Sequence, residues 1–189
     1  DSWVRTILLT TFCEGAMMFG ALAYIGAYLK SRFELSFLLI GALLACYGIG
    51  ALVYSILVPF LLRHMDQKAF VRLGGMIMLF CFVSLPWIPF WPAAAPLLIG
   101  AGFGFYMFHN TLQTNATEMA PLARGTAIAV FAFSLFVGQA AGISLFGQSI
   151  RLAGYTITFG AIGVLFLLLS RWFSAKIAGR DPKNLSAEG

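Results

Sequence analysis

The sequence has 189 residues, of which 60% are hydrophobic and 10% are charged, and its mean hydropathy is +0.90. Soluble domains carry about 25% charged residues, so this composition excludes an ordinary soluble domain and indicates a protein whose solvent is the lipid bilayer. The formal charge of +5 does not indicate nucleic acid binding, because the basic residues flank apolar runs, where membrane topology explains them.

The apolar runs are long enough to cross a bilayer. Residues 73–117 contain no Asp, Glu, Lys or Arg, and one crossing takes about 20 apolar residues, so this stretch is expected to cross twice. Prolines and tryptophans crowd between Pro86 and Pro96. The reversal is expected there, because proline interrupts a helix and tryptophan favours the headgroup layer.

Dividing the chain at its charge clusters and its Pro and Gly residues predicts six membrane-spanning helices. Helices are required because unpaired backbone amides are costly in hydrocarbon, and the runs are too long and too apolar for barrel strands. The predicted fold class is all-α, a polytopic bundle with one domain over residues 1–177 and a polar tail over 178–189. The helices are expected at about 5–30, 36–62, 69–88, 93–119, 125–150 and 155–175.

The basic residues divide unequally between the two predicted sides of the membrane. By the positive-inside rule the richer side faces the cytoplasm, so both ends are expected there, in a protein of the bacterial inner membrane. The first residue is Asp rather than Met and the first apolar run contains Glu14, which indicates a piece of a longer protein without a clean signal peptide. The richer side holds Arg5, Arg63, Lys68, Arg72, Arg124, Arg171, Lys176, Arg180 and Lys183, and the other holds Lys30, Arg32 and Arg151.

Small residues recur at helical spacing in three of the predicted helices. In lipid such positions allow neighbouring backbones to approach closely, so we interpret them as helix contacts, either static or sliding. They are Gly41, Ala45 and Gly48 in the second helix, Gly100 and Gly104 in the fourth, and Ser134, Gly138 and Gly142 in the fifth.

Glu14 is the one acid in the interior of a predicted span. It lies about 13 Å beyond Arg5 along a helix, which places its carboxyl at membrane depth. A carboxylate there is costly unless it is protonated, paired or facing water, so Glu14 is the leading candidate for proton coupling or cation recognition. The alternative is a protonated carboxyl that bonds a neighbouring helix. Thr10 and Met18 are expected on the same helix face.

His109 is expected at the same depth as Glu14. It precedes Glu118 in a helix that runs inward, so it also lies about 13 Å from the predicted cytoplasmic end. The matched depth motivates the hypothesis that Glu14 and His109 face one another and act together in proton coupling. The alternative is a histidine that bonds a backbone carbonyl inside the bundle.

The helix that carries His109 also carries a polar stripe, which should not face lipid. It is expected to line a water-filled cavity, together with Thr10 and Met18, whereas hydrogen bonding between helices is the alternative. The stripe comprises Tyr106, Asn110, Gln113, Thr114 and Thr117, and Gln139 is expected to reach the same space from the next helix.

Three charged residues near the predicted cytoplasmic ends form a candidate gate, namely Asp66, Glu118 and Arg124. A network among them would close the inward mouth of a cavity. The alternative is that these charges stay solvated and fix the topology of the chain.

The stretch Asn115–Thr126 and the layout of the whole chain resemble the major facilitator superfamily, and Arg63–Lys68 stands where the family has a second conserved loop but departs from the signature of that loop. The resemblance implies one half of a twelve-helix transporter, built from two inverted three-helix repeats at about 4–88 and 93–177, which alternates access around a midplane cavity. In the second loop the family signature is Gly-x-x-x-Asp-Arg-x-Gly-Arg, and Arg63 and His64 stand at its Asp-Arg positions. Because that signature is usually eroded in the second half, the resemblance favours the carboxyl-terminal half.

The sequence therefore predicts half of a secondary active transporter that moves a small organic solute, such as a sugar or a drug, and couples its import or efflux to protons. The expected partners are a complementary six-helix half, membrane lipid and the solute, with no cofactor and no metal. An enzyme is disfavoured because HExxH and GxSxG motifs are absent. A structural or regulatory membrane subunit is the alternative.

Overall fold

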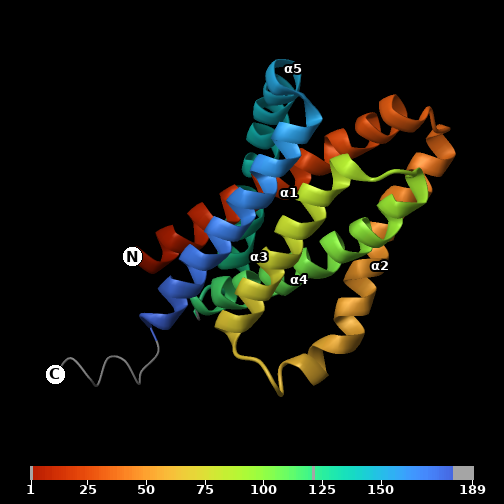
Figure 1. Cartoon of the computed structure of the whole chain (residues 1–189). Coiled ribbons are helices and arrows are strands. Elements are labelled where there is room, and N and C mark those ends of the chain that lie inside the picture. Colours follow the sequence, from red (N-terminus) through yellow and green to blue (C-terminus); the bar gives the residue numbers. More distant parts are fainter. Residues whose placement is uncertain (1, 121, 181–189) are drawn as a thin grey trace.

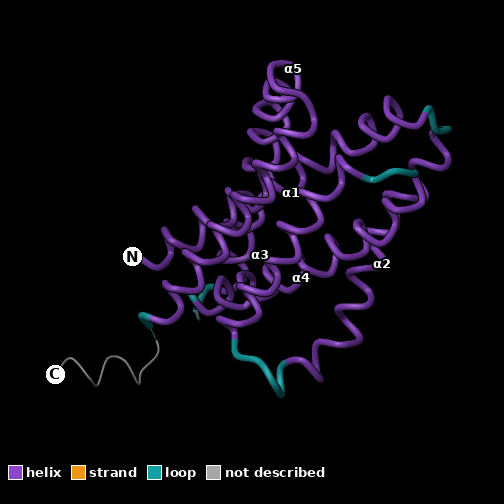
Figure 2. The backbone as a smooth tube through the Cα atoms, viewed as in Figure 1, coloured by secondary structure: helices purple, strands orange, loops and turns teal. Residues whose placement is uncertain are grey.

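The structure, a computed structural model, describes residues 2–120 and 122–180. Over these residues it contains helices and no strand, so the predicted all-α class is confirmed (Figure 2). The elements are α1 (Ser2–Phe33), α2 (Phe37–Leu61), α3 (Gln67–Ser84), the short 3₁₀ turns η1 (Leu85–Trp87) and η2 (Trp91–Ala93), α4 (Ala94–Glu118) and α5 (Arg124–Ala178).

Five helices in the described part of the chain are long and apolar enough to cross a membrane. The fifth, α5, has 55 residues and contains one residue with non-helical dihedrals, Gly154, at φ 79° and ψ 173°. Figure 1 shows α5 reversing its direction at its upper end. We call residues 124–153 the first limb and residues 155–178 the second limb, and they cover the residues where the sequence predicts a fifth and a sixth helix. Glycine suits this position because it adopts a positive φ at little cost, whereas a residue with a side chain would be strained.

The helix ends gather at two opposite ends of the bundle. At one end, which we call the terminal end, the rings of Trp3 and Phe173 stack with centroids 6.1 Å apart, and the Asn115 amide donates to Gln67 Oε1 at 3.3 Å. At the far end, the Tyr28 hydroxyl donates to the carbonyl of Leu85 at 3.3 Å. The starts of α1 and α3 and the ends of α4 and α5 therefore lie at the terminal end.

This arrangement puts the described basic residues of the richer side toward the terminal end, as the sequence predicts. Arg151, three residues before Gly154, belongs to the far end together with Lys30 and Arg32. Lys183 and residues 181–189 of the predicted tail lie outside the described residues.

Close backbone contacts through glycines hold the helices in pairs. A Cβ built on Gly138 would collide with the carbonyl oxygen of Phe12, and one on Gly142 with that of Ala16, so α1 lies against the first limb of α5. Gly102 makes the same contact with Tyr47, which joins α4 to α2. The helices approach this closely because glycine presents no side chain at the contact.

The predicted small-residue contacts are therefore confirmed for α4 and α5 but not for α2. Gly100 and Gly104 face Cys81 and Ile77 of α3, whereas a Cβ on Gly41 or Gly48 would meet nothing within 4 Å. The glycine of α2 that forms a helix contact is Gly50, against Ile99 of α4.

Gly142 and Gly48 provide a matched test of this packing. Gly142→Ala is expected to lower the melting temperature in detergent, because the new Cβ collides with the α1 backbone and forces the two helices apart. Gly48→Ala makes the same chemical change where space is open, and alanine favours helix by about 1 kcal/mol over glycine. It should leave the melting temperature unchanged or raise it. Equal losses in both variants would contradict the packing described here.

Candidate functional site

Glu14 of α1 and His109 of α4 are in contact. The His109 Nδ1 atom lies 3.2 Å from Glu14 Oε1 and 3.1 Å from Glu14 Oε2. The Glu14 side chain is fully buried and that of His109 is 14% exposed. The contact that matched depth predicts is thus present, and it joins residues that are 95 positions apart in the sequence.

Local helix packing explains why Glu14 points into the bundle. The next residue, Gly15, faces the backbone of Leu135 in the first limb of α5, where a Cβ would collide with the Leu135 carbonyl oxygen. Successive residues of a helix are about 100° apart around its axis, so with Gly15 against α5 the side chain of Glu14 projects to one side of that contact. There it meets α4 rather than lipid.

Aromatic rings surround the imidazole of His109. The Phe105 ring stacks on it with centroids 5.0 Å apart and an interplanar angle of 16°. Phe131 of α5 and Tyr106 of α4 lie at 5.5 Å and 6.2 Å. Such surroundings make an unpaired charge costly, so the carboxylate of Glu14 needs the imidazole as its hydrogen-bond partner.

This pair can exist in two protonation states that both keep the hydrogen bond. With the imidazole protonated and the carboxyl ionised, the pair is a buried ion pair, in which Nδ1–H donates to the carboxylate. With the imidazole neutral and the carboxyl ionised, Nδ1–H still donates, and the pair carries one net negative charge. Gain or loss of one proton therefore changes the net charge of the site while the hydrogen bond is kept, which is the property a proton-coupling site requires.

The predicted polar stripe of α4 lies beside the pair, on the less buried face of the helix. Gln113 and Thr114 are exposed, and Tyr106, Asn110 and Thr117 are partly exposed. The opposite face of α4 carries buried Thr111 and Asn115, which bond within the bundle. The exposed stripe therefore offers hydrogen-bonding groups that the described helices leave uncovered.

Two residues expected to line the cavity are instead in the core. Thr10 and Met18 are both fully buried, and the Thr10 hydroxyl donates to the carbonyl of Thr6 in its own helix at 2.7 Å. They share the face of Glu14, but that face is closed by the packing of α1 against its neighbours. Gln139 lies partly exposed on the first limb of α5, next to the contact glycine Gly138.

The three candidate gate residues form no mutual network in this structure. Asp66 caps α3 by accepting a hydrogen bond from the Ala69 backbone N–H at 2.8 Å, and its carboxylate lies 3.8 Å from Lys68 Nζ. Glu118 and Arg124 are exposed at the helix ends, and no ion pair among the described residues joins them to each other or to Asp66. Asp66 thus has a local role as a helix cap.

Sequence reasoning overlooked Tyr47 of α2. Its hydroxyl oxygen is buried and has no hydrogen-bond partner among the described residues. Its ring lies 6.0 Å from Phe105 and 6.4 Å from Tyr106, both neighbours of His109. The available signal was weak, since Tyr47 and Tyr54 are seven residues apart on one helix face and no charge marks either.

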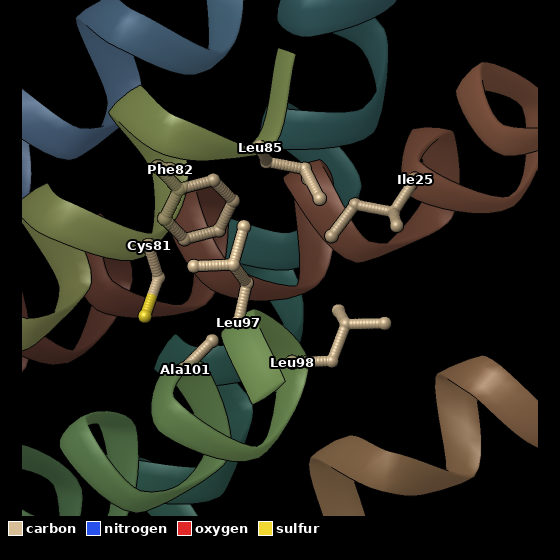
Figure 3. A pocket seen from close by; sticks show the side chains of 7 residues that line it. All are labelled: Ile25, Cys81, Phe82, Leu85, Leu97, Leu98 and Ala101. Carbon is tan, nitrogen blue, oxygen red and sulfur yellow. The ribbon is translucent and has the colours of Figure 1, made fainter. Parts of the chain in front are cut away.

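The small pocket between the helices does not suit a transported solute. The pocket in Figure 3 lies among α1, α3 and α4, measures about 10 Å³ and is lined by apolar side chains, so it has room for about one water molecule and nothing to bind it. A second hollow of about 500 Å³ opens at the terminal end beside Lys176 and Arg180. It adjoins residues outside the described range.

In the described residues, no three His, Cys, Asp or Glu side chains come together in a way that could hold a metal ion.

The sequence model of the Major Facilitator Superfamily matches residues 1–143. The matched range includes α1 to α4 and part of the first limb of α5, and so both Glu14 and His109. No curated protein is similar enough to the chain to count as a match.

A double-mutant cycle measures how strongly the buried pair is coupled. We expect Glu14→Gln and His109→Phe to have non-additive effects on the free energy of unfolding in detergent, with a coupling of about 0.5–3 kcal/mol, because each single change leaves the other partner without its native bond. Glu14→Gln combined with Tyr28→Phe is the control, since Tyr28 lies at the far end. Additive energies for the first pair would contradict a direct interaction.

Proposed function

Because the chain belongs to the Major Facilitator Superfamily, whose members are membrane transporters and not enzymes, we propose that it is half of a secondary active transporter. In this proposal the transport of a small organic solute is coupled to the movement of protons. The observation that carries the proposal is the buried contact between Glu14 and His109. A buried carboxyl is costly in a membrane, and such residues mark proton and substrate pathways.

The proton-coupling role rests on the chemistry of this pair. A histidine changes charge near neutral pH, and a carboxylate bonded to it gives the added proton a stable place inside the bundle. A structural subunit has no need of this arrangement, because an apolar pair of the same volume packs as well without the cost of desolvation. The pair is therefore better explained by transport than by a scaffold.

The membrane arrangement that we propose has six crossings. The 55 residues of α5 contain about 80 Å of helix at 1.5 Å per residue, summed over both limbs, far more than the hydrocarbon core of about 30 Å. The first and second limbs would then cross separately, on either side of Gly154. Residues 4–88 and 93–177 would form two inverted repeats, so that Glu14 and His109 stand on the first helix of each repeat.

The exposed polar stripe of α4 supports a complementary half as partner. Hydrogen-bonding groups do not face lipid without cost. A second six-helix half over this face would enclose the stripe in a midplane cavity, where Tyr106, Asn110 and Gln113 would contact the solute. Asp66, Glu118 and Arg124 would lie at the cytoplasmic mouth of that cavity.

Proteoliposomes test the transport proposal directly. The chain, with and without a complementary half, is reconstituted with a pH-sensitive dye inside, and a hexose and the cationic dye ethidium are offered as two probes. We expect solute-driven proton flux that falls at least tenfold in Glu14→Gln, because the amide cannot take part in proton exchange. Ser144→Ala is the control, since Ser144 is exposed and bonds within its own helix. Flux that survives in Glu14→Gln would refute coupling through this residue.

Cysteine labelling tests the six crossings and their direction. With Cys13, Cys46 and Cys81 replaced by alanine, single cysteines are placed at Arg63, Glu34, Phe90, Ala153 and Arg180. Impermeant reagent is expected to label positions 34, 90 and 153 from outside intact cells, and positions 63 and 180 only after the inner side is opened, because the terminal end holds most of the basic residues. Labelling of position 153 and position 180 from one side would rule out two crossings by α5.

A further inference from the structure

The Tyr47 hydroxyl is an unusual group for a packed helix interface. It is a hydrogen-bond donor that is buried and has no partner among the described residues. Buried polar groups are nearly always bonded, and each exception calls for a physical reason. Two other tyrosines at helix contacts differ, since Tyr24 donates to the carbonyl of Ile143 at 2.7 Å and Tyr28 to that of Leu85.

The position of Tyr47 is fixed by backbone packing. The Tyr47 carbonyl oxygen lies where a side chain on Gly102 would be, and Gly50 packs against Ile99 in the same way. These contacts hold α2 against α4 and press the Tyr47 ring toward Phe105. Phe105 in turn stacks on His109, so Tyr47 is one aromatic ring away from the buried pair.

Glu14 is the nearby group that can use another donor. Each carboxylate has two oxygens with about four acceptor sites, and both oxygens of Glu14 contact the same atom, His109 Nδ1. The Tyr47 ring packs on Phe105, and Phe105 stacks on the His109 imidazole, so the Tyr47 side chain belongs to the aromatic cluster around the buried pair. The buried acceptor thus has spare capacity, and a buried donor without a partner is near it.

We propose that Tyr47 is the alternative hydrogen-bond donor to Glu14, taking the place of His109 when the imidazole leaves the carboxylate. The inference rests on the proposed function, because it assigns Tyr47 a step in the cycle of the same site. His109 is partly exposed and borders the polar stripe, so it can turn toward a solute there. Tyr47 would then keep the buried carboxylate bonded while His109 is engaged, and Tyr47 is a positioning residue.

The other titratable groups around Glu14 are less suited to this role, because Tyr106 belongs to the partly exposed polar stripe and a cysteine thiol is a weak donor. From α4 the site is faced by His109 and Tyr106, and Cys13 is on α1 itself. The charged residues of α3 and α5 belong to the terminal end, apart from Arg151 near Gly154. Tyr47 is therefore the residue to test.

The test compares Tyr47→Phe in two backgrounds by its effect on the melting temperature of the full chain in detergent. In the wild-type background we expect a rise of about 2–4 °C, because the change removes an unbonded buried hydroxyl and keeps the ring. In the His109→Phe background we expect a fall of similar size, because Tyr47 is then the donor that Glu14 uses. A change of the same sign in both backgrounds would overturn the proposal.

Two further variants make the comparison specific. His109→Asn keeps an N–H at about the position of Nδ1, so Tyr47→Phe in that background should again raise the melting temperature. Tyr24→Phe is the control for the chemical change, and it should lower the melting temperature in every background, because its hydroxyl is bonded. If His109→Phe does not fold, His109→Leu takes its place with the same two outcomes.

Infrared spectroscopy gives a readout that would not change if Tyr47 had only a structural role. The carboxyl band of Glu14, identified by its loss in Glu14→Gln, should shift on Tyr47→Phe in the His109→Phe background and stay in place in the wild-type background. An unmoved band in both backgrounds would overturn the proposal. These measurements need no solute, so a negative result for Tyr47 can be told apart from a negative result for proton-coupled transport. The latter is reported by the proton flux in proteoliposomes that contain the Glu14→Gln variant.

Discussion

Backbone contact between helices is the constraint on which the rest of this structure depends. Where α1 crosses the first limb of α5, carbonyl oxygens of the facing helix fill the space that a side chain on Gly15, Gly138 or Gly142 would occupy. Lipid tails are as apolar as leucine, so association in a bilayer depends on close packing of this kind rather than on the hydrophobic effect. The contact fixes the rotation of α1 about its own axis, and this rotation turns Glu14 toward α4.

A second contact of the same kind sets the other side of the site. Gly102 of α4 lies against the Tyr47 backbone of α2, and His109 follows Gly102 by two helical turns, on nearly the same face. Phe105 stands between them and stacks on the imidazole. The two glycine contacts together bring an acid from one helix pair to a histidine of the other, and neither residue would reach its partner if either pair moved apart.

Hydroxyls elsewhere in the bundle often bond within their own helix, while Tyr24, Ser134 and Asn115 link neighbouring helices. The hydroxyls of Thr10, Thr11 and Thr111 donate to carbonyls four residues earlier in their own helices. Among the described residues, Glu14 and His109 make the hydrogen bond that joins α1 to α4. Under the proposed function, gain or loss of a proton at this bond would change how α1 and α4 sit relative to each other during alternating access.

Sequence alone was sufficient for the helical class, because hydrocarbon forces every span to satisfy its own backbone. It was also sufficient for most helix ends and for the division of the described basic residues between the two ends of the bundle. Depth along a helix was also readable, since 1.5 Å per residue is fixed, and it predicted that Glu14 and His109 could meet. Rotation about the helix axis was not readable. It depends on which glycines contact a neighbouring backbone, so Thr10 and Met18 proved to be core and Tyr47 was missed. The tertiary structure decided the rotation of each helix. Side chains at equal depth can face a cavity, another helix or lipid, and contacts between helices far apart in the chain determine which of these they face.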